Sequence, residues 1–303
     1  MKNYLGYIYA IISASTFGLI PMFSIPAINA GMSVNSALFY RYLSSTIILG
    51  TFLIIKKKNI RVKREELTTL AGLILLGGTT ALFLMNSFRY IPSGVASTIH
   101  FLYPVVVAML MTILFKEKFS IFYFIAIILA LMGVAAISGL SSSFEVNTTG
   151  IIYVILSVIT YALYIVGINK SKAGRMSPTS MTLYIMIMLT MFFLILSIPE
   201  GGVQAIPNRE VLGSLTLLSL VSTLLSNFTL ILAIKSIGST TTSIMGCVEP
   251  VTALTVGILV FGEPITSTQM LGVALILSSV SFVILSNRLS RRFKAIATRF
   301  STN

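Results

Sequence analysis

The sequence is poor in charged residues, above all acidic ones, and in the side chains that most enzyme sites use. Only 10% of its 303 residues are charged and only eight are Asp or Glu, with one histidine, one cysteine and no tryptophan. A water-soluble domain of this length needs far more polar surface. A single thiol excludes a disulfide framework within the chain. We expect no metal site and no cofactor, because no second histidine or thiol cluster accompanies His100.

Hydrophobic residues are abundant instead, at 56% of the chain, with a mean hydropathy of +0.97. A helix needs about 20 apolar residues to cross a bilayer core of about 30 Å. The sequence holds ten such runs with little between them, which predicts an all-α integral membrane protein with ten transmembrane helices. The expected spans are 4–27, 35–55, 67–88, 93–115, 119–140, 149–168, 179–198, 211–234, 238–261 and 267–286.

The net charge of +13 is unevenly distributed along these spans. With the N-terminus in the cytoplasm, 18 of the 21 Lys and Arg residues fall in cytoplasmic segments, and only Arg41, Arg89 and Arg209 fall outside. This is the positive-inside pattern. It predicts a multi-pass protein of the cell membrane with both termini cytoplasmic, and leaves no basic patch that would indicate nucleic-acid binding. A secretory signal at the N-terminus is not expected, because its apolar run is too long and contains Pro21.

The two halves of the chain resemble each other. An offset of 146 superimposes residues 93–120 on 239–266 without a gap, and an offset of 144 aligns "GYIYAIISASTF" from Gly6 with "GIIYVILSVITY" from Gly150. Each half carries five helices, and an odd number makes the second half enter the membrane from the opposite side. We therefore predict two inverted five-helix repeats, residues 1–140 and 149–286, followed by a tail, residues 287–303.

The motifs "LYPVVVAMLMTILFKE" (102–117), "VEPVTALTVGILVFGE" (248–263) and "LGVALILSSVSFVIL" (271–285) resemble the drug/metabolite transporter superfamily, EamA type. The resemblance covers essentially the whole chain. It implies a secondary transporter that exports small metabolites, with amino acids and related amphoteric compounds as the first candidates. Phe17 stands where the family often has a tryptophan, and Lys116 where it has a glycine. The family is broad, so the resemblance leaves open the substrate, the direction, the coupling ion and the oligomeric state.

Pro104 and Pro250 are equivalent in the two repeats and lie near the middle of their spans. Each lacks an N–H, so the carbonyls of His100 and Gly246, four residues earlier, lose their helical donor. Paired helix breaks near the midplane build binding sites in inverted-repeat transporters. We predict that both prolines, with Gly246, form such a hinge; the alternative is a kink that serves packing alone.

Glu249 lies roughly 14 Å from the inner end of its span at 1.5 Å per residue, close to the bilayer centre. A carboxylate at this depth must face a cavity or a partner. We predict that it contacts substrate or carries a proton, which makes protons the candidate coupling ion. The alternative is a protonated glutamate that is hydrogen-bonded to a neighbouring helix.

Other polar and aromatic residues at membrane depth are candidates for the same translocation site. His100 shares a helix face with Tyr103, and either could line a cavity or serve packing. Arg41 could hold a substrate carboxylate, or its side chain could snorkel to the headgroups. Further candidates for the cavity wall, each also suited to packing, are Phe17, Tyr161, Tyr164 and Asn227.

Glu117 and Glu263 are equivalent in the repeats but stand at opposite membrane faces. Each precedes a predicted helix cap, Ser120 or Thr266, so we predict structural turns there. The tail places Leu289, Phe293, Ile296 and Phe300 on one helical stripe. It reads as a basic amphipathic helix on the anionic inner leaflet.

Transport is the function that these features favour. No GxxxxGK[ST] motif is present, so transport would run on a gradient, by alternating access around a midplane cavity. An intramembrane enzyme is not expected, because the sequence has one His, one Cys, no HExxH and no GxSG-like motif. A channel or receptor is less well supported than a transporter, since an inverted repeat favours alternating access. The alternative substrate is an organic cation or drug-like compound that uses the same cavity.

Overall fold

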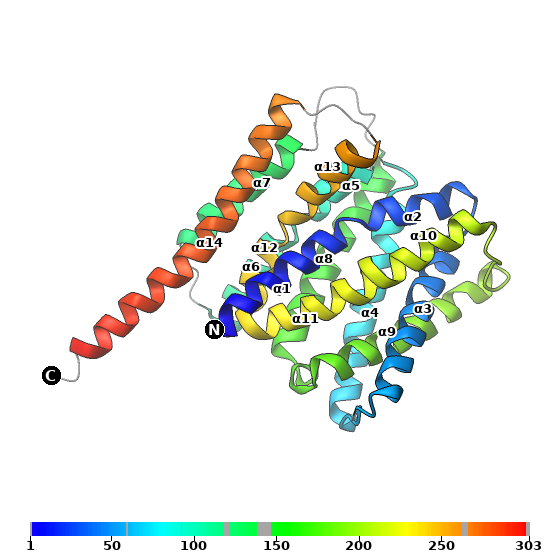
Figure 1. Cartoon of the computed structure of the whole chain (residues 1–303), viewed down its shortest axis with the longest axis horizontal. Helices are drawn as coiled ribbons and strands as arrows, with labels where there is room; N and C mark the ends of the chain where they lie inside the picture. The colour runs from blue at the N-terminus through cyan, green and yellow to red at the C-terminus, as the bar shows by residue number, and fades with distance from the viewer. Residues whose placement is uncertain are drawn as a thin grey trace.

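The computed structural model describes residues 2–58, 60–91, 93–117, 121–137, 147–261 and 266–300, and no strand occurs among them. Figure 1 shows a bundle of helices in which α7 and α14 form a pair along one side. The helices are α1 (Lys2–Phe17), α2 (Ile20–Asn29), α3 (Val34–Ile55), α4 (Arg64–Ser87), α5 (Ser93–His100), α6 (Tyr103–Phe115), α7 (Ile121–Ile137), α8 (Thr148–Lys170), α9 (Pro178–Ser197), α10 (Arg209–Ser219), α11 (Ser226–Ile237), α12 (Ser239–Met245), α13 (Val248–Phe261) and α14 (Ser267–Phe300). Two 3₁₀ turns, η1 (Lys172–Arg175) and η2 (Ile198–Glu200), and a π-helical turn, η3 (Leu220–Leu225), complete the described chain.

The all-α membrane class is confirmed over the described residues. Six segments are long and apolar enough to cross a membrane: Tyr4–Asn29, Val34–Ile55, Arg64–Ser87, Thr148–Lys170, Pro178–Glu200 and Arg209–Ile237. Shorter apolar helices are Tyr103–Phe115, Ile121–Ala136 and Ser267–Val283. The predicted tail continues α14 as one helix to Phe300, and its side chains lie outside the described residues.

Four of the predicted spans are not continuous α-helices. The first breaks at Gly18–Leu19, the fourth at Phe101–Leu102 and the ninth at Gly246–Cys247, while η3 interrupts the eighth. Pro21 and Pro104 lie in the first turn of the helix that follows the break. A proline costs no hydrogen bond there, because the first N–H groups of a helix have no intrahelical acceptor.

The two halves pack through matching helix pairs. Helix α1 packs on α11 and α4 packs on α8, while α3 packs on α9 and α7 on α14 (Figure 1). Glycine allows a close approach in each half: a Cβ at Gly6 in α1 would lie 2.7 Å from Cγ2 of Ile237 at the end of α11, and one at Gly150 in α8 would lie 2.7 Å from Cγ2 of Ile91 in the segment after α4. Each half therefore uses a glycine at an equivalent position to allow a close contact with the other half.

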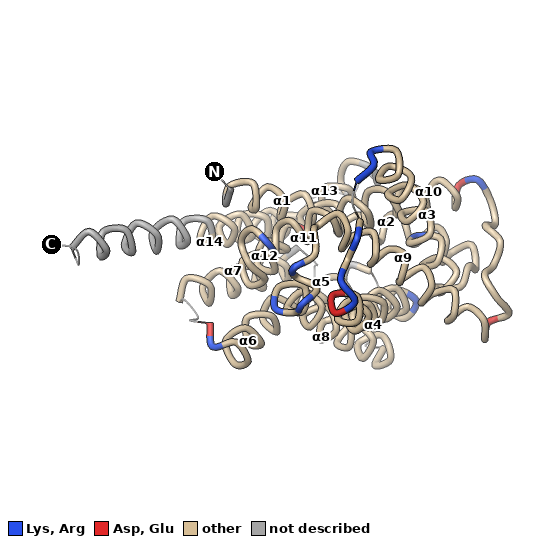
Figure 2. Tube along the Cα trace, turned by 90° about the horizontal axis from the view of Figure 1, so that it is seen from below, with Lys and Arg blue, Asp and Glu red and all other residues tan. Residues whose placement is uncertain are grey.

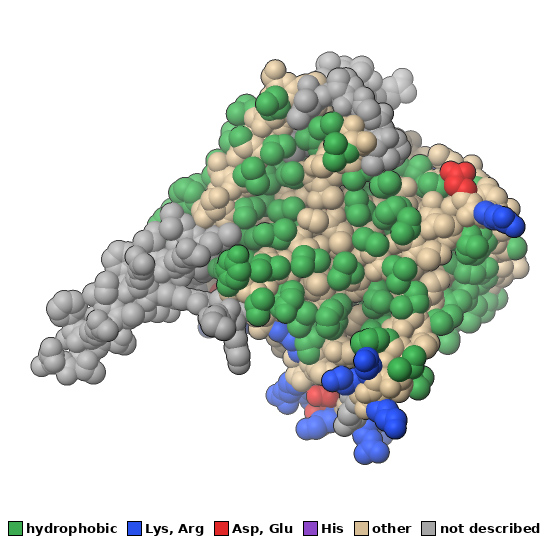
Figure 3. Space-filling model, viewed as in Figure 1, with side chains coloured by type: hydrophobic (Ala, Val, Ile, Leu, Met, Phe, Trp, Pro, Cys, Tyr) green, Lys and Arg blue, Asp and Glu red, His purple; other side chains and the backbone are tan. Residues whose placement is uncertain are grey.

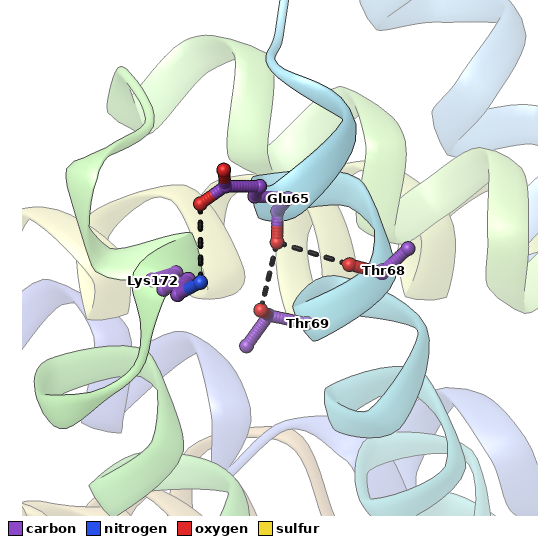
Figure 4. Close-up of polar contacts among 4 residues, drawn as sticks. All are labelled: Glu65, Thr68, Thr69 and Lys172. Carbon is purple, nitrogen blue, oxygen red and sulfur yellow. Dashed lines mark hydrogen bonds and ion pairs between the residues drawn. The ribbon is translucent and has the colours of Figure 1, made fainter.

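Basic residues gather where residues 56–58, 60–64 and 170–175 meet, which we call the basic end (Figures 2 and 3). Lys172 Nζ pairs with Glu65 Oε2 at 3.1 Å, and the Glu65 carbonyl accepts hydrogen bonds from Thr68 and Thr69 (Figure 4). Hydrophobic side chains are spread over the rest of the described surface in Figure 3, interspersed with the tan of other side chains and backbone.

Candidate functional site

Glu249 and Tyr103 meet directly beyond the two helix breaks. Tyr103 is the first residue of α6 and Glu249 the second of α13. The Tyr103 hydroxyl donates to Glu249 Oε1 at 3.2 Å, and Tyr103 is buried. Gly246 leaves the space for this hydroxyl, because a Cβ at that position would collide with it. A break in each of two helices thus brings a phenol and a carboxylate together inside the bundle.

The Gly246 carbonyl does not face a ligand. It has lost its usual donor to Pro250, as the sequence predicts, but it accepts instead from the backbone N–H of Glu249 at 2.9 Å. This tighter i to i+3 bond satisfies the carbonyl at the break. What the break offers to a substrate is therefore the side chain of Glu249.

His100, the last residue of α5, is 2% exposed and is oriented by Ser157. Its Nδ1 lies 2.8 Å from Ser157 Oγ, and that hydroxyl donates to the Val154 carbonyl at 2.7 Å. Because the serine proton is engaged, Nδ1 is the donor, and Nε2 of the neutral ring is an acceptor. No hydrogen-bond partner of Nε2 exists among the described residues.

Glu249 and His100 line one cavity, the Glu249 cavity, which holds about 390 Å³ of space free of atoms, part of it open to the outside. It lies away from the basic end, since its wall includes Leu84 and Phe88 at the far end of α4. Gly18, in the break between α1 and α2, approaches the Glu249 backbone so closely that a Cβ would lie 2.5 Å from the Glu249 carbonyl oxygen. The wall comprises Phe17, Gly18, Ile20, Pro21, Leu84, Phe88, Ser97, His100, Glu249, Pro250 and Ala253.

Arg41 is buried in protein, at 3% exposure, and does not snorkel to the surface. Its Nε donates to Thr223 Oγ1 at 2.5 Å and its Nη2 to the Ser222 carbonyl at 3.4 Å. Both acceptors lie in the π-turn η3, and the guanidinium carbon lies 5.3 Å from the centroid of the Tyr42 ring. No carboxylate pairs with Arg41 in the part of the chain that the structure describes.

Arg41 lines the second cavity, the Arg41 cavity, with about 490 Å³ of atom-free space, also partly open. Its wall brings together the predicted residues Tyr161, Tyr164 and Asn227. Asn227 Nδ2 donates to the Thr223 carbonyl at 2.9 Å, so η3 fixes this side chain too. The wall comprises Phe17, Ile20, Arg41, Tyr42, Gly77, Thr80, Ala81, Leu84, Met85, Tyr161, Tyr164, Leu189 and Asn227.

The predicted translocation residues are thus divided: Glu249 and His100 line one cavity, Arg41, Tyr161, Tyr164 and Asn227 line the other, and Tyr103 lines neither. Tyr42, Thr223 and Ser157 were not predicted; the position of Tyr42 beside Arg41 was the only available signal for it. Glu117 lies elsewhere, in an ion pair with Lys170 at 2.9 Å at the basic end. Glu263 lies outside the described residues. Thr266 caps α14 as predicted, accepting from the Gln269 N–H at 3.2 Å.

Comparisons with known proteins point to one family. The EamA-like transporter family model matches residues 4–139 and again residues 148–285. A protein of Archaeoglobus fulgidus, named an uncharacterized transporter, is 26% identical over 245 residues, 80% of this chain and 86% of that protein. The uncharacterized transporter YdfC of Bacillus subtilis is 23% identical over 287 residues, 91% of this chain and 90% of its own. A protein of known crystal structure superimposes with a TM-score of 0.76 over 95% of this chain and 98% of the other, at 14% identity, which concerns the fold alone.

Proposed function

Because the chain belongs to the EamA-like transporter family, we propose that it is a secondary transporter that exports a small amphoteric metabolite, an amino acid or a related compound, by alternating access. The observation that carries this proposal is the pair of adjacent internal cavities, one with a carboxylate and the other with a guanidinium. Charged groups inside a membrane protein are costly and typically mark a substrate or ion pathway. Protons are the candidate coupling ion, and Glu249 the group that would carry them.

The proposal includes ten transmembrane helices in two inverted halves. A two-fold axis maps a contact between equivalent residues onto itself. Thr46 Oγ1 lies 3.2 Å from Thr190 Oγ1, an offset of 144, and Tyr103 bonds Glu249 at an offset of 146. Both contacts support a pseudo-two-fold axis through the centre of the molecule. By the positive-inside rule the basic end faces the cytoplasm of the cell, as do both termini.

The test is efflux from proteoliposomes loaded with a mixture of amino acids. Glu249→Gln and Arg41→Gln should each abolish efflux of the transported compound, because each removes one charge that recognises it. Glu117→Gln is the matched control, since its carboxylate pairs with Lys170 at the basic end, and it should retain efflux. Unchanged efflux in both cavity variants would overturn the proposal, and flux that ignores an imposed pH gradient would remove protons as the coupling ion.

A second candidate, transport of an organic cation, is favoured by one specific observation. The Glu249 cavity has a carboxylate but no Lys or Arg in its described wall. A cation could therefore bind there without Arg41. In the same proteoliposomes, Arg41→Gln would leave the flux of a cation intact and abolish that of an amphoteric compound, which separates the two candidates.

A further inference from the structure

The two cavities have a common wall. Phe17, Ile20 and Leu84 line both. The Phe17 ring stacks on the Tyr161 ring at 5.6 Å and on the His100 ring at 6.3 Å, each at an interplanar angle of 16°, and the His100 and Tyr161 rings lie 5.2 Å apart, so the three rings form one cluster. Among these neighbours, His100 lines only the Glu249 cavity and Tyr161 only the Arg41 cavity. The cluster of Phe17, His100 and Tyr161 therefore lies where the two spaces meet, and we call it the partition; of its three rings Phe17 is the one that lines both cavities.

The opposite charges lie on different sides of this partition. Glu249 lines one cavity and Arg41 the other, and no contact joins them among the described residues. Tyr103 covers Glu249 through its hydroxyl, and the Tyr103 ring lies 4.7 Å from the Tyr161 ring. An α-amino acid carries its ammonium and carboxylate groups on a single carbon. A compound with a spacer between its charges can place one of them in each cavity, and an α-amino acid has no such spacer.

Each cavity also has hydrogen-bonding capacity suited to one end of such a compound. In the Glu249 cavity, His100 Nε2 is a buried acceptor without a partner among the described residues. An ammonium group can donate to this nitrogen and to the Glu249 carboxylate at once. In the Arg41 cavity, the guanidinium is free of any described carboxylate and can bind one in a fork.

Helix α1 ends at the partition. Phe17 is its last residue, and the Gly18–Leu19 turn follows. Gly18 packs against the Glu249 backbone so closely that a Cβ at position 18 would not fit. This contact fixes the end of α1, from which the Phe17 ring projects, beside the backbone of Glu249.

We propose that the substrate occupies both cavities at once, with its ammonium at Glu249 and His100, its carboxylate at Arg41 and an apolar spacer beside Phe17. The substrate class is then an ω-amino acid or another amphoteric compound with well-separated charges, and Phe17 is the specificity-determining residue. This inference rests on the proposed function and names the substrate class of the same site.

The first test measures binding of glycine, β-alanine, γ-aminobutyrate and ε-aminocaproate to the purified protein, by calorimetry in detergent, and their efflux from proteoliposomes. Affinity should rise along the series. Glu249→Gln and Arg41→Gln should each weaken ε-aminocaproate by about tenfold or more, while hexylamine, which lacks the carboxylate, should respond to Glu249→Gln alone. A flat series, or glycine as the best ligand, would overturn the inference.

The second test changes the partition. Phe17→Leu should admit para-aminomethylbenzoate, whose rigid ring is wider than an alkyl spacer, while Phe17→Trp should exclude it and weaken even ε-aminocaproate. Phe39→Leu makes the same change at a ring that lines neither cavity and should leave selectivity as in the wild type. Thermal melting shows whether each variant is folded. Because the two Phe17 variants should change binding in opposite directions, the remaining variant still tests the inference if one of them does not fold.

The outcomes separate the inference from the function on which it rests. Transport that does not depend on spacer length or on residue 17 would overturn the inference and leave the proposed transporter standing. If no amphoteric compound and no organic cation is bound or moved by the folded protein, the proposed function falls and the inference falls with it.

Discussion

At the scale of single residues, the centre of the site depends on a fit between Tyr103 and Gly246. The tyrosine hydroxyl occupies the space that a side chain at position 246 would fill, and from there it donates to Glu249. Such a donor stabilises a carboxylate that is half-buried inside the bundle, because it replaces hydrogen bonds to water that are lost on burial. The glycine is thus required for a hydrogen bond in which it takes no part.

We predict that Gly246→Ala displaces the Tyr103 hydroxyl and destabilises the protein by about 1–3 kcal/mol, the usual range for overpacking. Thermal melting in detergent measures the loss. Tyr103→Phe removes the atom that the new methyl group would meet, so the double variant should lose less than the sum of the single variants. Gly213→Ala is the control, since a Cβ there meets nothing within 4 Å. Additive losses would contradict the proposed clash.

The sequence predicts individual residues of the site better than their partners. Glu249, His100 and Arg41 stand out because polar groups are rare in these spans. That Tyr103 bonds Glu249 does not follow from either helix alone. It depends on where two helices cross, which packing across the bundle decides. The same limit explains why Glu249 and Arg41, both predicted for one cavity, line two.

At the scale of helices, two close crossings hold the halves together. Gly6 meets Ser236 and Ile237, and Gly150 meets Tyr90 and Ile91. The two glycines are 144 residues apart and their contacts 146 apart. Equivalent glycines thus bring α1 against the end of α11 and α8 against the segment after α4. The alignment of the two glycines was visible in the sequence, but the segments they contact were not.

We expect Gly6→Ala and Gly150→Ala to lower the melting temperature by similar amounts, because each added methyl group would lie 2.7 Å from an isoleucine methyl. Gly72→Ala, in the interior of α4, provides the control. A Cβ there meets nothing within 4 Å, and alanine favours a helix over glycine by about 1 kcal/mol. Gly72→Ala should therefore be neutral or stabilising. A large loss at only one of the two crossing glycines would contradict their equivalence.

The π-turn η3 is one difference between equivalent spans. The caps of α4 and α10, Lys63 and Asn208, are 145 residues apart, whereas beyond these spans Ile91 and Ile237 are 146 apart. The second half thus carries one more residue in this span, and a π-turn accommodates an extra residue within a helix.

Ser222 and Thr223 in η3 bind Arg41, and the equivalent of Arg41 in the second half is Ile185. Comparison of offsets could reveal the extra residue, but not the turn that holds it.

At the scale of the whole molecule, the two ends of the bundle differ. At the basic end, Lys235 Nζ donates to the Gly174 and Met176 carbonyls at 2.5 and 2.6 Å, which ties α11 to η1. Asn169 Nδ2 donates to Ser239 Oγ at 3.0 Å beside it. The equivalent of Lys235 at the other end is Arg89, which is exposed. The cavities lie toward that end.

Alternating access would explain this difference between the two ends of the bundle. In an inverted repeat, the opposite conformation arises when the two halves exchange their arrangements. The equivalents of Gly174 and Met176 are Ala30 and Met32. We therefore predict that Lys235 releases its carbonyls in the other state, while Arg89 binds those of Ala30 and Met32 and closes the end that is now open.

Opposite effects of two substitutions would reveal this exchange. Lys235→Ala removes contacts of the present state, and Arg89→Ala removes contacts of the other, so the populations should move in opposite directions. A hydrogen bond from a charged group contributes about 1.5–3 kcal/mol, enough to shift the ratio of states by about tenfold or more. A cysteine at the cavity wall, Ala253→Cys, with the buried native thiol removed by Cys247→Ala, reports which state is populated.

An impermeant maleimide applied from the side opposite the basic end should label this cysteine more slowly in Lys235→Ala, because fewer molecules are open to that side. Labelling in Arg89→Ala should be as fast as in the parent or faster. Arg209→Ala provides the control, as it removes an arginine that has no equivalent role in the exchange. If Lys235→Ala and Arg89→Ala shift labelling in the same direction, the two residues do not stabilise opposite states. The difference between the two ends would then not arise from an exchange between conformations.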